Sequence, residues 1–227
     1  MIRAVIFDLD GTFVDTEPLH FAAFNEVLRP EEIEIPRDEY FARLIGLNDH
    51  DCFAMVLREN RMDAGEEHIA GLMARKTVIY QAMVADREVL YPGAEKFVRD
   101  CARRFPLMIA TGTLRAEAEA ILRRAGLREL FLDIIAAEDV ERGKPAPDAF
   151  IAALGRLGLI LGQRDPIRAD ECIVVEDTRA GIEAAHRAGM KVLALCHSAP
   201  AADLAAADVV RDSISGLDLD EILRGRG

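Results

Sequence analysis

Short runs of apolar residues alternate along much of the chain with segments in which apolar residues recur at helical spacing. Such runs are typical of strands buried on both faces of a parallel sheet. Strands are expected at 4–7, 106–113, 172–177 and 191–195, with a short last strand at 207–210. Helices are expected from about 90 to 102 and at 116–124, 148–157 and 181–188. This alternation predicts right-handed βαβ units and a parallel sheet with helices on both sides.

One long stretch near the start of the chain carries no strand signal. It contains only helical patterns, at 19–28, 38–44, 50–59 and 66–83, and Thr16 or Asp15 can cap the first of these. We therefore expect an α/β fold whose Rossmann-like parallel sheet, flanked by helices, is formed by residues 1–14 and 92–227. An inserted all-helical cap domain is expected at 15–91. The hinge is expected near Asp15 and at 86–92.

Polar side chains stand at the ends of several predicted strands. In a parallel sheet the carboxyl ends of the strands share one edge, so we expect these groups to converge on a single site. Four of them are carboxylates, one is a hydroxyl, and one is an ammonium group in a Gly-Lys-Pro loop. They are Asp8, Asp10, Thr111, Lys144, Glu176 and Asp177.

This set of groups suits phosphoryl chemistry. Clustered carboxylates repel one another unless a cation lies between them, and Mg²⁺ prefers such oxygen ligands. A hydroxyl and an ammonium group can hold the oxygens of a phosphoryl group. One carboxylate can attack phosphorus and form an aspartyl phosphate, while a second acid two residues away transfers the proton.

The same motifs resemble those of the haloacid dehalogenase-like superfamily. The sequence Asp-Leu-Asp-Gly-Thr at 8–12, Thr111, Gly-Lys-Pro at 143–145 and Glu-Asp at 176–177 occur in the order found there. The helical insertion resembles that of the capped phosphatase and β-phosphoglucomutase-like branch. The resemblance extends from Val5 to about Leu195.

The resemblance implies catalytic roles for individual residues. Asp8 matches the nucleophile, and Asp10 matches the general acid and base. Thr111 matches the phosphate-binding hydroxyl, with backbone from Gly112, and Lys144 matches the lysine that steadies the nucleophile and the phosphoryl oxygens. The segment at 111–113 departs from the serine- and asparagine-rich loop of many relatives.

The resemblance also implies the cofactor Mg²⁺. Asp8 would bind the metal through its carboxylate and Asp10 through its backbone carbonyl. Asp177 matches the principal distal ligand, and Glu176 would act either directly or through a water. The alternative is that these two acids only favour the start of the next helix, for which Thr178 is the expected N-cap.

Substrate contacts are expected from the cap and from the segment after Thr111. For His20 a surface position is the alternative, for Lys76 a solvated helix position, and for Arg115 a place at the start of its helix. His186 and His197 are assigned no role. The candidate substrate-binding residues are Glu17, His20, Arg43, Gly46, Lys76, Gly112, Thr113 and Arg115.

The leading function is a Mg²⁺-dependent phosphatase that hydrolyses a small phosphomonoester, such as a sugar phosphate or a phosphoglycolate-like ester. The alternative is a β-phosphoglucomutase-like sugar phosphomutase. A receiver-like phospho-acceptor without enzymatic activity is a remote alternative, against which the inserted cap and Asp10 argue. A metal-free dehalogenase would not need Asp10 and Asp177.

Composition narrows the partners. The net charge of −12 and the isoelectric point near 4.9 argue against nucleic acid, and no basic amphipathic segment indicates a membrane. The four cysteines form no Cys-x-x-Cys pair, so neither zinc nor a disulfide framework is expected. The chain starts directly with a strand and has no signal peptide pattern. We expect a cytoplasmic monomer or weak dimer that binds a small phosphorylated metabolite.

Overall fold

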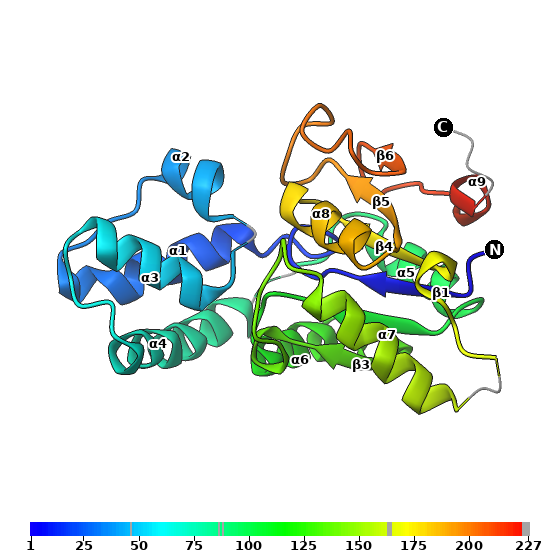
Figure 1. The fold of residues 1–227 in the computed structure, drawn as a ribbon. Helices are drawn as coiled ribbons and strands as arrows, with labels where there is room; N and C mark the ends of the chain where they lie inside the picture. The colour runs from blue at the N-terminus through cyan, green and yellow to red at the C-terminus, as the bar shows by residue number, and fades with distance from the viewer. Residues whose placement is uncertain (46, 86, 88, 163–164, 224–227) are drawn as a thin grey trace.

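The protein has an α/β fold, as the pattern of expected strands and helices predicts. The computed structural model describes the chain except residues 46, 86, 88, 163–164 and 224–227 (Figure 1). Its six-stranded sheet has the order β3-β2-β1-β4-β5-β6, and all neighbouring strands are parallel. The strands are β1 (Ala4–Phe7), β2 (Leu107–Ala110), β3 (Phe131–Ile135), β4 (Cys172–Glu176), β5 (Lys191–Leu195) and β6 (Val209–Arg211).

The first strand lies at the centre of the sheet. The last residue of β1, Phe7, is in register with Ile109 of β2 and with Val175 of β4. All four residues of β1 are buried, because helices cover both faces of the sheet. The residues that follow β1, β2 and β4 therefore emerge next to one another at one edge.

Helices of the core domain pack on both faces of the sheet. Along β1, Val5 and Phe7 point into one apolar cluster, whereas Ala4 and Ile6 point into a second cluster on the opposite face. The α-helices are α5 (Ala94–Ala102), α6 (Arg115–Arg124), α7 (Asp148–Leu161), α8 (Arg179–Arg187) and α9 (Leu219–Leu223). Short 3₁₀ turns are η3 (Arg128–Leu130), η4 (Ala137–Asp139) and η5 (Ala169–Glu171).

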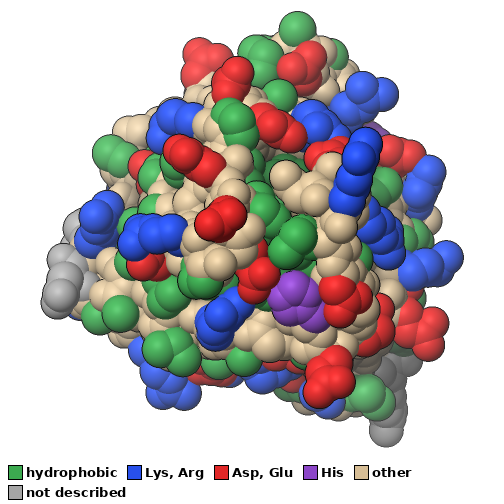
Figure 2. Space-filling model, turned by 90° about the vertical axis from the view of Figure 1, so that its left-hand side faces the viewer, with side chains coloured by type: hydrophobic (Ala, Val, Ile, Leu, Met, Phe, Trp, Pro, Cys, Tyr) green, Lys and Arg blue, Asp and Glu red, His purple; other side chains and the backbone are tan. Residues whose placement is uncertain are grey.

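A helical cap is inserted after β1. It consists of α1 (Glu17–Leu28), η1 (Arg29–Glu31), α2 (Arg37–Glu39), η2 (Tyr40–Leu44), α3 (Asp49–Glu59) and α4 (Glu66–Ala85). The cap has an apolar core of its own, which includes Phe24, Phe53 and Leu72. Acidic and basic side chains are interspersed over its outer surface (Figure 2). The single helix expected at 38–44 is one α-helical turn followed by a π-helical segment, in which the amide of Ile45 donates to the carbonyl of Tyr40.

Two connections join the cap to the core, and they run side by side. Val14 forms an antiparallel bridge with Leu90, and the amide of Asp15 donates to the carbonyl of Val89. The amide of Tyr91 donates to the carbonyl of Phe13 at 3.1 Å. The domain boundaries at 14/15 and 91/92 stay a prediction, and residues 86 and 88 of the expected hinge lie outside the described part of the chain. No described helix is long and apolar enough to cross a membrane.

The aromatic packing of β1 generates a stability prediction. Phe7 is fully buried and makes edge-to-face contacts with Phe13, Phe97 and Phe131 at centroid distances of 5.7, 6.2 and 5.9 Å. Phe7→Ala should lower the free energy of unfolding by about 3–5 kcal/mol, because it leaves a cavity under the central strand. Urea unfolding measures this loss. Leu159→Ala, at an exposed site of α7, is the control and should change the stability by less than about 0.5 kcal/mol. Equal losses in the two variants would contradict the central role of β1.

Candidate active site

Three buried carboxylates meet at the carboxyl edge of the sheet. Asp8 directly follows β1, Glu176 ends β4, and Asp177 comes next. One oxygen atom from each of the three lies within 4.8 Å of the others. The three residues are 7%, 0% and 1% exposed. Water therefore does little to screen the repulsion between them.

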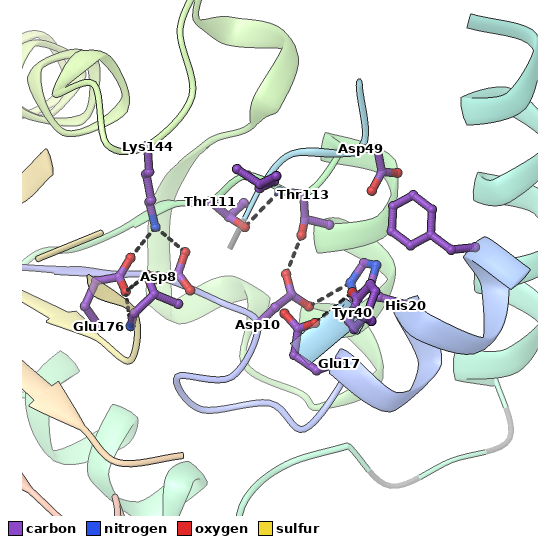
Figure 3. A pocket seen from close by; sticks show the side chains of 14 residues that line it. Asp8, Asp10, Glu17, His20, Tyr40, Asp49, Thr111, Thr113, Lys144 and Glu176 are labelled. Atoms are coloured by element: carbon purple, nitrogen blue, oxygen red, sulfur yellow. Dashed lines mark hydrogen bonds and ion pairs between the residues drawn. The ribbon is translucent and has the colours of Figure 1, made fainter. Parts of the chain in front are cut away.

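Lys144 neutralises part of this charge. Its ammonium group donates to Asp8 Oδ1 and to Glu176 Oε1, both at 2.5 Å (Figure 3). Burial disfavours the charged form of Lys144, but the two carboxylates outweigh burial and raise its pKa above the ordinary value. The ammonium group therefore remains charged between the two acids, where it can also reach a phosphoryl oxygen.

One lysine does not balance three carboxylates. Burial raises the pKa of Asp8 to about 7, against the opposing effect of Lys144, and the charge of Glu176 adds to the rise. Burial, followed by the charges of Glu176 and Asp8, raises the pKa of Asp177 well above its ordinary value. Asp177 Oδ2 is buried and has no hydrogen-bond partner among the described residues. A divalent cation fits these donors, because it would bind the unpaired oxygen and offset the excess negative charge.

Two glycines make room for the acids. Gly11 has a positive φ of 73°, and a Cβ atom there would lie 2.1 Å from Asp177 Oδ2. A Cβ atom on Gly181, in α8, would lie 1.7 Å from Glu176 Oε1. Both distances are shorter than any real contact, so a side chain at either position would have to displace one of these carboxylates. Thr178 caps α8 by accepting from the amide of Gly181 at 3.1 Å, which confirms its expected role.

Asp10 has a different environment from Asp8. The hydroxyl of Thr113 donates to Oδ2, and His20 Nε2 lies 3.2 Å from Oδ1 (Figure 3). The hydroxyl of Thr16 also donates to Oδ1. Burial by itself would raise the pKa of Asp10, but the hydrogen bonds from His20, Thr113 and Thr16 oppose burial and favour the ionised form of this acid. Thr16 lies at the N-cap of α1 but makes no side-chain capping bond, since its hydroxyl is bound to Asp10.

His20 connects Asp10 to a buried ion pair in the cap. Lys76 Nζ lies 2.9 Å from His20 Nδ1 and 2.7 Å from both carboxylate oxygens of Asp49. An ammonium group can only donate, so Nδ1 accepts and Nε2 carries the hydrogen that points to Asp10. His20 also stacks on Tyr80 with ring centroids 4.2 Å apart. His20 and Lys76 are 6% and 0% exposed, so the surface and solvated positions considered as alternatives are wrong.

The structure brings some of the expected substrate-binding residues to the pocket but not others. Glu17, His20, Gly112 and Thr113 line it together with the catalytic candidates, and Lys76 lies directly behind His20. Arg43 and Arg115 do not line it. Arg43 is bound to Glu39 and Glu59, and Arg115 is bound to Asp139 and to the carbonyl of Ile134. Gly46 lies outside the described residues.

His197 supports the site, although no role is assigned to it from the sequence. Its Nε2 accepts from the amide of Ile214 at 3.3 Å, so Nδ1 carries the hydrogen. Nδ1 lies 2.9 and 3.1 Å from the carbonyls of Gly11 and Thr12 and thereby fixes the turn after Asp10. The ring also packs against Tyr91, with centroids 4.0 Å apart. No local pattern could reveal contacts between residues that lie so far apart in sequence.

Comparisons with known proteins agree with this geometry. The model of the haloacid dehalogenase-like hydrolase family matches residues 2–189. The chain is 32% identical to fructose-1-phosphate phosphatase YqaB of Escherichia coli (strain K12), over 82% of this chain and 92% of that protein. It is 30% identical to β-phosphoglucomutase of Bacillus subtilis (strain 168), over 96% of this chain and 93% of the relative.

A solved structure also has the same fold. It is that of CbbY from Rhodobacter sphaeroides in complex with xylulose-(1,5)bisphosphate. The TM-score is 0.84 and the sequence identity 30%, and the match covers 96% of each chain. The resemblance therefore includes the cap as well as the sheet.

The close approach of Gly181 to the Glu176 carboxylate generates a prediction about the metal site. Gly181→Ala should push the Glu176 carboxylate out of place and weaken Mg²⁺ binding by about 10- to 100-fold, since groups that orient ligands have effects of this size. Isothermal titration calorimetry with Mg²⁺ measures the loss. The control is Gly155→Ala on α7, where a Cβ atom meets nothing within 4 Å. Unchanged affinity in Gly181→Ala would show that Glu176 does not shape the metal site.

The environment of His197 predicts a contribution to pH-dependent stability. Burial lowers the pKa of His197 below 6.5, although its bonds to the carbonyls of Gly11 and Thr12 oppose this effect. The folded state therefore favours the neutral ring, whose stabilising effect is complete above about pH 6.5 and is lost as the pH falls through the folded-state pKa. Between about pH 8 and about pH 5, the wild type should lose more free energy of unfolding than His197→Gln. Urea unfolding at both pH values checks this, with the surface variant His68→Gln as control. Equal losses in wild type and His197→Gln would contradict the prediction.

Proposed function

Since this chain belongs to the haloacid dehalogenase-like hydrolases, in the branch that contains β-phosphoglucomutase, CbbY and YqaB, we propose that it is a Mg²⁺-dependent phosphatase of small phosphomonoesters. The observation that carries the proposal is the different environment of two acids only two residues apart. Asp8 faces Lys144 and the other two buried carboxylates, whereas Asp10 faces hydroxyl donors and His20. Acids in separate environments can take separate catalytic roles.

In the first step an Asp8 oxygen attacks phosphorus in line with the leaving oxygen. The bond from phosphorus to the leaving oxygen breaks, and Asp10 gives that oxygen a proton. Lys144 and Thr111 hold phosphoryl oxygens while charge moves across them. Asp10 must first take up the proton that it transfers, and the negative charge of a bound phosphoryl group favours this uptake.

In the second step water attacks phosphorus in the aspartyl phosphate. Asp10 accepts the proton from this water, for which its ionised form, favoured by the hydrogen bonds described above, is required. The bond between phosphorus and Asp8 breaks, and the products are inorganic phosphate and the free carboxylate. Mg²⁺ held by Asp8, Asp177 and the carbonyl of Asp10, with Glu176 beside them, would supply charge stabilisation to the phosphoryl oxygens.

Phosphorylated sugars are the proposed substrates. The relatives support this class, because one of them is named as a fructose-1-phosphate phosphatase. The test is a screen of phosphomonoesters with and without Mg²⁺, in which inorganic phosphate and isomeric sugar phosphates are both measured. We expect Mg²⁺-dependent phosphate release that is abolished by EDTA and restored by added Mg²⁺. No phosphate release from any ester would refute the proposal.

A sugar phosphomutase is the second candidate. The observation in its favour is that His20, from the cap, binds Asp10, so the cap takes part in setting the state of the acid and base. The aspartyl phosphate would then pass to a sugar hydroxyl instead of water. Conversion of β-glucose 1-phosphate to glucose 6-phosphate without net phosphate release would establish this function in place of the first.

The nucleophile assignment gives a direct prediction. Asp8→Asn should lower kcat by at least about 10⁴-fold, because an amide cannot form the aspartyl phosphate. Phosphate release under single-turnover conditions measures the effect. Asp38→Asn is the matched control, since Asp38 is an exposed residue at the start of α2 and should leave kcat unchanged. Retained turnover in a folded Asp8→Asn enzyme would refute the scheme.

A further inference from the structure

The leaving group of the substrate must extend past Asp49. The pocket at the catalytic acids leaves a space of about 50 Å³, which is too small for a whole sugar phosphate. A neighbouring cavity of about 600 Å³, between the cap and the core, is within the usual range of about 300–1,000 Å³ for ligand sites. The two share five lining residues, namely Leu47, Asp49, Thr111, Gly112 and Lys144. The wider cavity therefore leads directly to the phosphoryl site.

Acidic side chains dominate this cavity away from the phosphoryl site. Asp49 lies where the two spaces meet, and Glu17 lines the inner pocket. Asp51, Glu138 and Glu141 line the outer cavity. Their combined field opposes the entry of a second anionic group.

The cations near this cavity already have carboxylate or imidazole partners. Lys76 is fully buried, is bound to both oxygens of Asp49, and has Glu117 3.9 Å away. Arg142 donates to both oxygens of Asp148 at 2.9 and 3.1 Å. The remaining basic groups, apart from Lys144, are the histidines. His20 is bound to Asp10 and Lys76, and His50 lies 3.1 Å from Glu66. A second phosphate would therefore have to break an existing ion pair in order to find a cation.

Glu117 is a second acidic residue beside Lys76, and burial raises the pKa of its carboxyl group. It is a residue of α6 and is 1% exposed, and neither of its carboxylate oxygens has a hydrogen-bond partner among the described residues. Lys76 thus faces two carboxylates, from the cap and from the core. Asp49 binds the ammonium group of Lys76 and thereby withholds this cation from a substrate.

We infer that this site selects phosphomonoesters whose leaving group is uncharged and hydroxylated, and that Asp49 is the residue that rejects a second anionic group. The inference rests on the proposed phosphatase function and names its substrate class. Carboxylates accept hydrogen bonds from hydroxyl groups, whereas a phosphate or carboxylate at the same place meets only repulsion. Specificity here comes from exclusion rather than from an added attractive contact.

The first test compares pairs of esters in which one member carries an additional anionic group. The best monoester of the screen is compared with the same ester carrying another anionic group. For a ketohexose, the pair is fructose 1-phosphate and fructose 1,6-bisphosphate. For a three-carbon ester, it is glycerol 3-phosphate and 3-phosphoglycerate. In each pair kcat/KM should be at least about tenfold higher for the ester without the second anionic group, given the size of like-charge repulsion in a partly buried site. Values within about threefold of each other, or a preference for the ester with the second anionic group, would overturn the inference.

The second test changes the charge of the cavity. Asp49→Asn keeps the shape of the side chain but leaves the charge of Lys76 without this carboxylate. The ratio of the two kcat/KM values within each pair of esters should therefore fall by about tenfold or more. Glu141→Lys should lower this ratio as well and leaves the buried ion pair intact, because Glu141 is an exposed residue at the outer cavity. This second variant keeps the test valid if Asp49→Asn does not fold.

The control and the contrary outcomes are distinct. Glu67→Gln removes one carboxylate from an exposed position on α4 and should leave the discrimination unchanged. Unchanged discrimination in both Asp49→Asn and Glu141→Lys would overturn the role assigned to the cavity charge. Absence of phosphate release from every ester would instead refute the phosphatase function. Release without discrimination would refute only the inference made here.

Discussion

The ion pairs of Lys144 with Asp8 and Glu176 are the interaction on which the site depends. They hold two carboxylates together at the ends of the neighbouring strands β1 and β4, where mutual repulsion would drive the two groups apart and burial would favour their protonation. The polypeptide supplies one ammonium group for three clustered acids. A divalent cation at Asp177 would balance the remainder, and in the proposed function the same residues would then receive a phosphoryl group at this edge of the sheet.

The groups that bind Asp8 and those that bind Asp10 come from different parts of the chain. Asp8 is bound by Thr12 and Lys144, both of the core. Asp10 is bound by Thr113 of the core and by Thr16 and His20 at the start of the cap. If Asp8 is the nucleophile and Asp10 the acid and base, as proposed above, the position of the cap would influence proton transfer rather than the attack on phosphorus.

The strands of the sheet and the acids at its carboxyl edge could be predicted from the sequence, because both produce patterns among neighbouring residues. Buried strands show as apolar runs, and Asp8 and Glu176 are conspicuous because they interrupt such runs. The contacts of the cap could not be predicted in this way. Arg43 was expected at the substrate but is bound to Glu59 one helix away, and nothing near His197 in sequence indicates that it holds the turn at 11–12. These outcomes depend on tertiary packing between segments that are distant along the chain.

The paired bridge between Val14 and Leu90 makes the cap a replaceable module. The cap leaves and re-enters the core at adjacent points and has an apolar cluster of its own, while Leu19 and Ala23 of α1 and Tyr80 and Val84 of α4 also pack into the cluster on one face of the sheet. An insert of another size or another charge pattern could therefore be grafted at the same two points without a change in the strands. In this architecture a single catalytic core can acquire new substrates by exchanging one continuous segment of the gene.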